Sequence, residues 1–210
     1  MIKPMFIVFE GVDGCGKTTL LESFKEYLIK SNIPVIINKE PWDGHKSTHK
    51  WIRKILDKEI MVDRSILEFL LLINRYHNNI WIKKKMKMGF TILQDRSFIS
   101  SVAYQYIFSE DFIVNMNSRF QRIDLLLFVN TPADECIRRI NTRGEKKTLY
   151  ERIEKLMSAN QRYVNFIDKY NEVDEDIRPY VKSYKLDGLN SKKDLYSNLI
   201  LIWEQFVMWK

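Results

Sequence analysis

A glycine-rich segment near the N-terminus, residues 11–18, constrains the fold of this chain more than any other feature. Its sequence, G-V-D-G-C-G-K-T, fits the pattern G-x-x-x-x-G-K-[ST]. Glycines let the backbone curl so that successive N–H groups point at phosphate oxygens. An apolar run at 5–9 precedes the segment, and apolar residues at helical spacing follow it. The segment therefore predicts a phosphate-binding loop between a strand and a helix, in which Lys17 reaches the β- and γ-phosphates and Thr18 holds Mg²⁺.

Five apolar runs of strand length alternate with helix-like segments along the chain. The expected strands are 5–9, 34–38, 90–94, 124–129 and 181–186, and the expected helices are 17–31, 63–87, 131–143, 149–170 and 191–209. Parallel strands need long crossovers, usually helices, and every gap here is long enough for one. We therefore predict an α/β P-loop NTPase fold, with about five parallel strands flanked by helices on both faces. We expect one domain over 1–210, with a lid segment around 138–150.

The composition is that of a small soluble enzyme. A chain of 210 residues with 45% hydrophobic content is long enough for one domain with a substantial core. Its net charge of +7 favours anionic partners, and the phosphate loop favours nucleotides over nucleic acid among them. The chain has two cysteines, Cys15 and Cys136, and we do not expect them to form a disulfide framework. With no membrane-span or signal-peptide pattern, we expect a cytoplasmic protein that binds neither nucleic acid nor membrane.

Polar residues follow several of the expected strands. Ligands of such sheets bind beyond the carboxyl ends of the strands, where this sequence has K-E-P-W at 39–42, D-R-S at 95–97 and N-T-P at 130–132. An acid beside an arginine can serve Mg²⁺ through water and a phosphate directly, as phosphoryl transfer requires. Asp95 and Arg96 could equally form a structural salt bridge.

These segments, in this order, resemble the thymidylate kinase family of nucleoside monophosphate kinases. The resemblance spans nearly the whole chain and has five parts: E-G-V-D-G-C-G-K-T-T at 10–19, K-E-P at 39–41, L-L-L-I-N-R at 70–75, D-R-S-F-I-S-S-V-A-Y-Q at 95–105, and R-G with L-Y-E at 143–151. The fourth part is the most specific. The resemblance implies a magnesium-dependent kinase that transfers the ATP γ-phosphoryl to dTMP, giving dTDP, and that forms a homodimer. The residues alone indicate only a P-loop phosphotransferase.

The resemblance also implies roles on the acceptor side. Asp13 accepts a hydrogen bond from the sugar 3′-hydroxyl, Arg75 and Arg96 hold the acceptor phosphate, and Asp95 orders magnesium-bound water. The other residues implied to contact dTMP are Glu40, Pro41, Leu71, Ser100, Ser101, Tyr104, Gln105, Tyr150 and Glu151. Ser100 and Ser101 stand at the thymine edge, and Tyr104 crowds a ribose 2′-hydroxyl. Taken singly, each aromatic residue is more often part of a core than a ligand contact.

On the donor side, the resemblance adds a basic lid to the phosphate loop. The implied ATP-binding residues are Gly11, Val12, Asp13, Gly14, Cys15, Gly16, Lys17, Thr18, Thr19, Arg139 and Arg143. The implied catalytic residues are Lys17, Asp13, Arg96, Asp95, Arg143 and Lys147. The small Gly14 indicates that the lid, rather than the loop, supplies the catalytic cation. Lys146 and Lys147 stand where the family has an arginine, so the choice of cation stays open, and a solvated face is the alternative for the whole cluster.

Leu71 departs from the family pattern. Family members usually have a phenylalanine here, four residues before the helix arginine, where it stacks on thymine. Phe69 cannot replace it, because six residues from Arg75 is about 120° around a helix, whereas Leu71 stays on the face of Arg75. An aliphatic contact with the base predicts looser base selectivity.

Two other functions remain as alternatives. A deoxyribonucleoside kinase shares the phosphate loop and basic lid, and commonly places its catalytic acid after the second strand, where Glu40 stands. The combination of Asp13 and Arg75 favours a monophosphate acceptor over a nucleoside. A nucleotide-dependent switch or a nucleic-acid-binding P-loop protein is the third reading, and the absence of an extra domain makes it the weakest.

Overall fold

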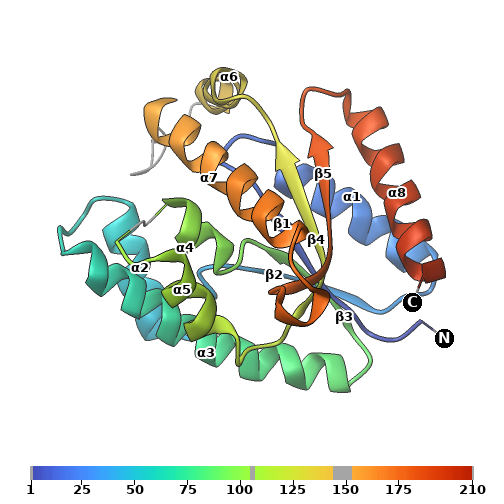
Figure 1. The fold of residues 1–210 in the computed structure, drawn as a ribbon, viewed down its shortest axis with the longest axis horizontal. Helices are drawn as coiled ribbons and strands as arrows, with labels where there is room; N and C mark the ends of the chain where they lie inside the picture. The colour runs from blue at the N-terminus through green and yellow to red at the C-terminus, as the bar shows by residue number, and fades with distance from the viewer. Residues whose placement is uncertain (1, 105–106, 144–152, 210) are drawn as a thin grey trace.

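A parallel sheet of five strands forms the centre of the molecule (Figure 1). The computed structural model describes residues 2–104, 107–143 and 153–209, except for the side chains of 143 and 177. The strands are β1 (Phe6–Glu10), β2 (Val35–Lys39), β3 (Thr91–Asp95), β4 (Ile123–Asn130) and β5 (Tyr180–Asp187). Their order across the sheet is β2-β3-β1-β4-β5, and every neighbouring pair is parallel. The central strand, β1, is buried along its whole length, as expected when helices cover both faces.

Helices cover the sheet from both sides. They are α1 (Lys17–Lys30), α2 (Lys46–Leu56), α3 (Arg64–Lys87), α4 (Ile99–Tyr104), α5 (Glu110–Asn117), α6 (Ala133–Arg143), α7 (Ile153–Asn171) and α8 (Lys192–Trp209), with a 3-10 turn, η1, at Glu175–Ile177. On one face α1 and α8 pack against each other, and on the other lie α3 and α7 (Figure 1). α4 packs on α7, and α2 packs on α3.

Two apolar cores hold these layers together. The larger core surrounds the sheet; in it Phe24 of α1 meets Trp203 of α8 edge to face, with ring centroids 5.5 Å apart. The smaller core lies between α2 and α3 and contains Ile52, Ile55 and Leu67. Leu71 packs at the edge of the smaller core. α2 is therefore held on α3 by apolar contacts, which positions both helices beside the carboxyl ends of β2 and β3.

The predicted fold is confirmed. All five expected strands are present within one or two residues of their predicted bounds. The helix expected at 131–143 begins at Ala133, directly after Pro132, and the helix expected at 149–170 is described from Ile153 onward. Three further helices, α2, α4 and α5, were not predicted. In the described part of the chain no helix is long and apolar enough to cross a membrane.

Candidate active site

The phosphate loop follows β1 and leads directly into α1. Gly11 and Gly14 have positive φ values of 143° and 82°. A Cβ at Gly11 would lie 2.6 Å from the Val129 carbonyl oxygen, and one at Gly14 would lie 2.6 Å from the Cys136 carbonyl oxygen. Both positions therefore need glycine for conformation and for space. The loop is seated against the end of β4 and the start of α6.

Lys17, the first residue of α1, lies inside the curl of the loop. Its side chain is buried, and Nζ donates to the carbonyl oxygens of Gly11 at 3.0 Å and Val12 at 3.2 Å. The loop is also held from outside, because Thr131 Oγ1 donates to the Cys15 carbonyl oxygen at 3.1 Å. The ammonium group thus adds its positive charge to the place where the loop N–H groups and the helix N-terminus already favour a bound anion.

A cavity of about 610 Å³ opens on the α6 side of the loop, and we call it the donor cavity. Its lining comes from the loop, α1, α6 and the turn after β5: Gly14, Cys15, Gly16, Thr19, Leu20, Ser23, Glu135, Arg138, Arg139, Thr142, Gly188, Asn190, Lys192, Leu195 and Tyr196. Glu135 forms ion pairs of 2.6 Å with both Arg138 and Arg139. Hydrogen bonds from these two arginines lower the pKa of Glu135 to about 2. Arg139 also donates to the Cys15 carbonyl oxygen at 3.2 Å and the Gly188 carbonyl oxygen at 2.9 Å. Arg139 thereby ties α6 to the phosphate loop, a contact consistent with its predicted place on the donor side.

Thr18 and Asp95 meet at the other edge of the loop. Thr18 Oγ1 donates to Asp95 Oδ2 at 3.4 Å. Asp95 Oδ1 is buried and has no hydrogen-bond partner among the described residues. A carboxylate oxygen without a partner beside a hydroxyl fits a Mg²⁺ site that takes its other ligands from water and phosphate. Among the described residues no cluster of three His, Cys, Asp or Glu side chains offers an all-protein metal site.

Asp13 and Arg96 form an ion pair across the phosphate loop. Arg96 Nη2 lies 2.5 Å from Asp13 Oδ1, and the Tyr104 ring lies under the guanidinium with its centroid 5.3 Å away. Burial raises the pKa of Asp13, but the positive charges of Arg96 and Lys17 outweigh it, so this pKa lies below its ordinary value. Asp13 is therefore an ionised acceptor at neutral pH.

The backbone of Arg96 is in the left-handed region, with φ of 69°. Its N–H donates to the Phe9 carbonyl oxygen at 3.0 Å, which ties the end of β3 to β1. This conformation turns the side chain back over the phosphate loop toward Asp13. Few non-glycine residues adopt it, and those that do are frequent at functional sites.

A buried network under Arg96 was missed in the sequence. Glu10, at the end of β1, is fully buried and accepts hydrogen bonds from Ser97 N at 2.6 Å and Ser97 Oγ at 2.8 Å. Its second oxygen accepts from Ser100 Oγ and Tyr163 OH, both at 2.9 Å. Arg96 Nη1 donates to these same two hydroxyls, at 3.2 Å and 3.3 Å. Glu10 therefore positions Arg96 through two hydroxyl groups.

Arg75 of α3 lies between two carboxylates. Its side chain is 4% exposed, Nε lies 2.8 Å from Glu40, Nη1 lies 3.2 Å from Glu68, and Nη2 donates to Ser101 Oγ at 2.7 Å. Burial raises the pKa of Glu40 to about 7, although the neighbouring Arg75 acts to lower it. Each of the three guanidinium nitrogens of Arg75 therefore already has a partner within the protein. The predicted role of Arg75 as a phosphate ligand stays a prediction.

These groups surround a second cavity, of about 130 Å³, which we call the acceptor cavity. Its lining is Asp13, Glu40, Pro41, Arg53, Leu56, Leu71, Arg75, Arg96, Ser100, Ser101 and Tyr104. Nine of these residues were predicted on the acceptor side. Leu71 is on the wall, while Phe69 is on another face of α3, half exposed and against the ring of Phe108.

Arg53 and Leu56 are the lining residues that sequence reasoning missed. Both belong to α2, which was not predicted. Arg53 pairs with Asp57 at 2.7 Å, and 43% of its side chain is exposed, in contrast to Arg75. The signal was available in W-I-R-K-I-L at 51–56, where apolar residues recur at helical spacing around Arg53.

Several predicted residues cannot be placed. Gln105, Lys146, Lys147, Tyr150 and Glu151 lie outside the described residues, as does most of the expected lid. Arg143 ends α6, but its side chain is also outside the described part.

Comparison with known proteins agrees with this geometry. The family model described as thymidylate kinase matches residues 9–179. A "Probable thymidylate kinase" of Sulfurisphaera tokodaii is 31% identical over 170 residues, covering 80% of this chain and 85% of the relative. One of Thermococcus onnurineus is 29% identical over 212 residues, covering 95% and 97%. A "Thymidylate kinase" of Leptospira interrogans is 33% identical over 175 residues, covering 80% and 83%. The family model covers the phosphate loop and every residue that lines the acceptor cavity, and the chain belongs to the thymidylate kinase family.

Proposed function

We propose that this protein transfers the γ-phosphoryl group of ATP to dTMP, giving ADP and dTDP. The observation that carries the proposal is the position of the phosphate loop between two cavities. Gly14, Cys15 and Gly16 line the donor cavity, and the preceding residue, Asp13, lines the acceptor cavity. Phosphates bound from the two sides would therefore meet at one loop, as in-line transfer requires.

Lys17 and Arg96 contact the phosphates of the two substrates in this proposal. Lys17 would exchange its loop carbonyls for the β- and γ-phosphate oxygens of ATP. Arg96, oriented by Asp13, Ser100 and Tyr163, would hold the acceptor phosphate. Fixed cations suit a reaction whose charge is spread over phosphoryl oxygens, because they need no reorganisation in the transition state.

We assign the second phosphate contact to Arg53 rather than to Arg75. The Arg75 side chain is buried, and its three guanidinium nitrogens are bound to Glu40, Glu68 and Ser101, so a phosphate would have to displace a buried partner. Arg53 pairs with Asp57, and both side chains are partly exposed, so a phosphate could displace the carboxylate. In this assignment Arg75 keeps Glu40 and Ser101 in place at the end of the cavity where the base would bind.

Mg²⁺ fits beside Thr18 and the unpartnered oxygen of Asp95. Bound there with ATP, it would neutralise charge on the phosphate oxygens. Thr18 and Asp95 thus have the role of holding and orienting the metal and its water.

We keep the single domain over 1–210 and a lid around 138–150 as parts of the proposal. α6 supports the lid, since it brings Arg138 and Arg139 to the donor cavity. Arg143 and Lys147 remain candidates for the lid cation that meets the transferring phosphoryl. Gly14 supports a lid cation, because the Cys136 carbonyl oxygen leaves no room for a side chain at that loop position.

The choice of acceptor tests the proposal against a nucleoside kinase. With ATP and Mg²⁺, dTMP should be turned over and thymidine should not. Efficient phosphorylation of thymidine without turnover of dTMP would establish the alternative. Arg53→Ala should raise KM for dTMP by at least about tenfold, the effect of losing a charge-assisted phosphate contact. Lys54→Ala, the neighbouring position on α2 that does not line the cavity, is the matched control.

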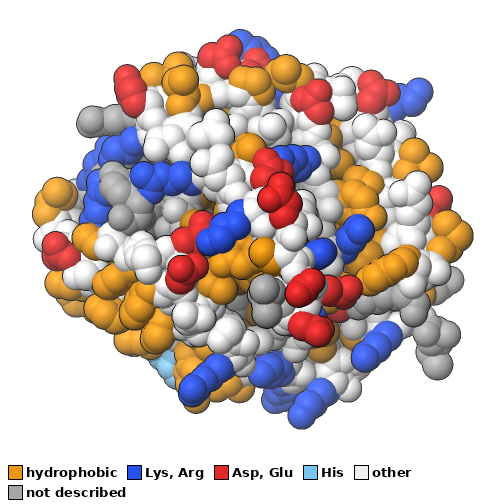
Figure 2. All heavy atoms as spheres, viewed as in Figure 1, with side chains coloured by type: hydrophobic (Ala, Val, Ile, Leu, Met, Phe, Trp, Pro, Cys, Tyr) orange, Lys and Arg blue, Asp and Glu red, His pale blue; other side chains and the backbone are white. Residues whose placement is uncertain are grey.

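An apolar stripe along α3 supports a homodimer. Ile66, Phe69, Ile73, Tyr76 and Ile80 recur at intervals of three and four residues, and each is 48–56% exposed. Figure 2 shows hydrophobic side chains gathered at its lower left, on the side of the molecule where α3 and α5 lie. A continuous stripe at this spacing suits packing against the same stripe of a second copy across a two-fold axis. We therefore propose a symmetric dimer through α3.

Measurement of the mass in solution tests the dimer. The wild-type protein should have twice the mass of the 25.3 kDa chain, and Ile73→Arg should be monomeric. Met157→Arg on α7, at a position that is 60% exposed and away from the stripe, should stay dimeric. A wild-type monomer would refute the proposal.

We also propose a cytoplasmic location. Both cysteines, Cys15 and Cys136, are free and buried, which suits a reducing compartment. Burial raises the pKa of Cys136 to about 12, so its thiol is unreactive at neutral pH.

A further inference from the structure

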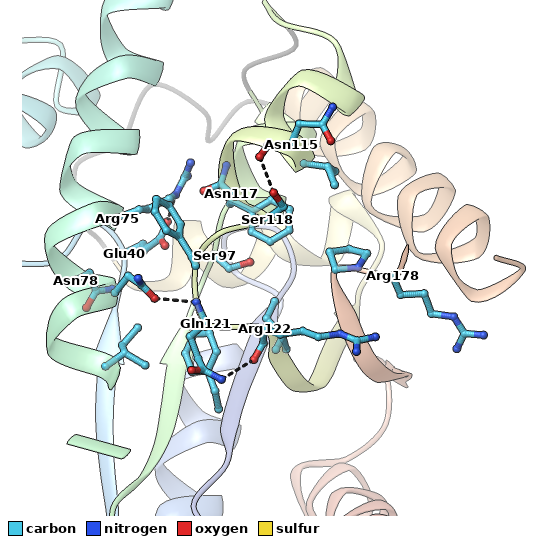
Figure 3. A pocket seen from close by; sticks show the side chains of 18 of the residues that line it. Glu40, Arg75, Asn78, Ser97, Asn115, Asn117, Ser118, Gln121, Arg122 and Arg178 are labelled. Carbon is cyan, nitrogen blue, oxygen red and sulfur yellow. Dashed lines mark hydrogen bonds and ion pairs between the residues drawn. The ribbon is translucent and has the colours of Figure 1, made fainter. Parts of the chain in front are cut away.

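A third cavity lies behind the acceptor cavity, between α3, α5 and the segments that lead into β4 and β5 (Figure 3). Its volume is about 390 Å³, within the range of small-molecule sites. It shares Glu40 and Arg75 with the acceptor cavity and no residue with the donor cavity. The Arg75–Glu40 ion pair is therefore a wall between this rear cavity and the proposed dTMP site.

The rear cavity contains buried polar atoms that the described residues leave without partners. Asn117 is 6% exposed; its Nδ2 donates to the Ile113 carbonyl oxygen at 2.7 Å, but its Oδ1 has no partner in the described part of the chain. Arg122 Nε is also buried and unpartnered within that part. Figure 3 shows Asn117 and Ser118 on one side of the cavity and Gln121 and Arg122 on the opposite side. Such groups lose free energy unless something in the cavity bonds to them.

The available hydrogen-bonding groups include both donors and an acceptor. The amide oxygen of Asn78 accepts from Asn38 at 2.7 Å, and that of Asn79 accepts from the Gln121 N–H at 2.7 Å. The amide nitrogens are thus the groups that these two side chains can present to a ligand, alongside Arg122 Nε. Asn117 Oδ1 is the matching acceptor. A lactam or imide edge, with an N–H beside a carbonyl, complements this combination.

The charges of the rear cavity favour an uncharged ligand. The Arg122 guanidinium is bound to the carbonyl oxygens of Glu175 and Tyr180. Arg178 Nε donates to the Val173 carbonyl oxygen at 2.8 Å, and Figure 3 shows its guanidinium extending away from the other labelled side chains. Arg75 is paired with Glu40 and Glu68, and the lining itself includes the carboxyl groups of Glu40 and Asp176, which would oppose a phosphate. Phe6, Phe98, Phe120 and Ile82 supply apolar walls for a planar ring.

We propose that the rear cavity binds a neutral heterocycle with a lactam or imide edge, a free nucleobase or a nucleoside, at a site separate from both nucleotide cavities. The ring lies among the apolar side chains, and its polar edge bonds to Asn117 and to the donors across the cavity. Because Glu40 and Arg75 line both cavities, an occupant also changes the affinity of the acceptor site.

Binding measurements on the full-length protein test this inference without relying on turnover. Uracil and uridine are titrated by calorimetry and by ligand-observed NMR, in the presence and absence of saturating dTMP. At least one should bind saturably at millimolar concentration in both conditions. With dTMP saturating the acceptor cavity, UMP should bind at least about tenfold more weakly, since the lining of the rear cavity does not favour a phosphate. Displacement of uracil and uridine by dTMP would place them in the acceptor cavity and refute the inference, whereas a protein that ignores dTMP but binds them would refute only the proposed function.

Variants of α5 locate the site. Asn117→Leu removes the unpartnered acceptor. Asn115→Trp fills the rim of the cavity from an exposed position and leaves the buried residues unchanged. Each should weaken binding by at least about tenfold, the effect of losing a buried hydrogen bond or the space for the ring. Met116→Trp, at an exposed position of α5 outside the cavity, is the matched control and should bind like wild type. No saturable binding to wild type, or equal binding in all variants, would overturn the inference.

Discussion

Removal of the Tyr163 hydroxyl group measures how much the buried network under Arg96 contributes to the free energy of unfolding. Tyr163 is fully buried; its OH donates to Glu10 at 2.9 Å and accepts from Arg96 at 3.3 Å. Tyr163→Phe removes this oxygen and keeps the ring, so the packing on Phe128 is retained. Glu10 keeps its bonds from Ser97 and Ser100. The variant loses the hydrogen bond to Glu10, the longer one from Arg96 and the contact with Ser100 Oγ at 2.8 Å. Loss of the bond to Glu10, the strongest of these, should lower the free energy of unfolding by about 1.5–3 kcal/mol.

Urea denaturation of wild type and variant measures this loss. Tyr27→Phe is a matched control, because the Tyr27 OH also donates to a glutamate, Glu204, at 3.1 Å, but at the surface. The free energy of unfolding should change by less than about 0.5 kcal/mol in the control. In thermal unfolding, Tyr163→Phe should lower Tm by about 3–12 °C for a chain of this size.

The same variant should weaken dTMP binding. Arg96 retains its bonds to Asp13 and Ser100, so KM for dTMP should rise while the fold remains intact. If Tyr163→Phe and Tyr27→Phe lose equal free energy, the buried network does not stabilise the fold as argued. An unchanged KM would show that Arg96 does not depend on Tyr163 for its position.

Three further variants address the loop, the base site and the buried glutamate. Lys17→Ala should lower kcat by at least about 100-fold without unfolding the protein, as loss of a transition-state donor does; near-normal turnover would reject the phosphate-loop assignment. Leu71→Phe should tighten dTMP by up to about tenfold by adding a ring against the base, and unchanged KM and kcat would show that position 71 does not contact it. Because the pKa of Glu40 is raised to about 7 from 4.5, the folded state holds this proton more tightly than the unfolded chain. The contribution of Glu40 to stability is thus present below pH 4.5 and is lost as pH rises to about 7; urea curves across this range should show a slope that Glu40→Gln removes, and an identical pH dependence in both proteins would contradict the raised pKa.

The fold could be predicted because each strand contains a short group of apolar residues, and the two longest groups are unbroken. β1 has F-I-V-F and β4 has L-L-L-F-V, all buried, as expected for strands covered on both faces. The carboxyl ends of parallel strands meet at one edge of the sheet, which is why the segments that contain residues 13, 40 and 96 could be expected near one another. Arg75, within α3, was assigned to the same site only through the family resemblance. The acceptor cavity gathers these four residues together.

Other parts could not be predicted, for identifiable physical reasons. α4 has six residues, too few to show a helical period. The contact between Glu10 and Tyr163 joins residues 153 positions apart, and neither residue type signals its partner. Glu68 lies two turns before Arg75 on the same helix, but Glu40 follows β2, and the sequence does not show that both glutamates bind this arginine.

The left-handed backbone conformation of Arg96 is unfavourable for residues other than glycine, yet the site has an arginine there. A non-glycine residue in this region costs about 1–3 kcal/mol, so glycine would suit the local backbone better. Among replacements that remove the guanidinium, Arg96→Gly should therefore fold more stably than Arg96→Ala, the reverse of the order found in ordinary helices. Both replacements should be less stable than the wild type, because each leaves the Asp13 carboxylate without the guanidinium that pairs with it. The contacts that orient Arg96 over the phosphate loop thus also offset the strain of its backbone, so the arginine and its partners have to be kept together.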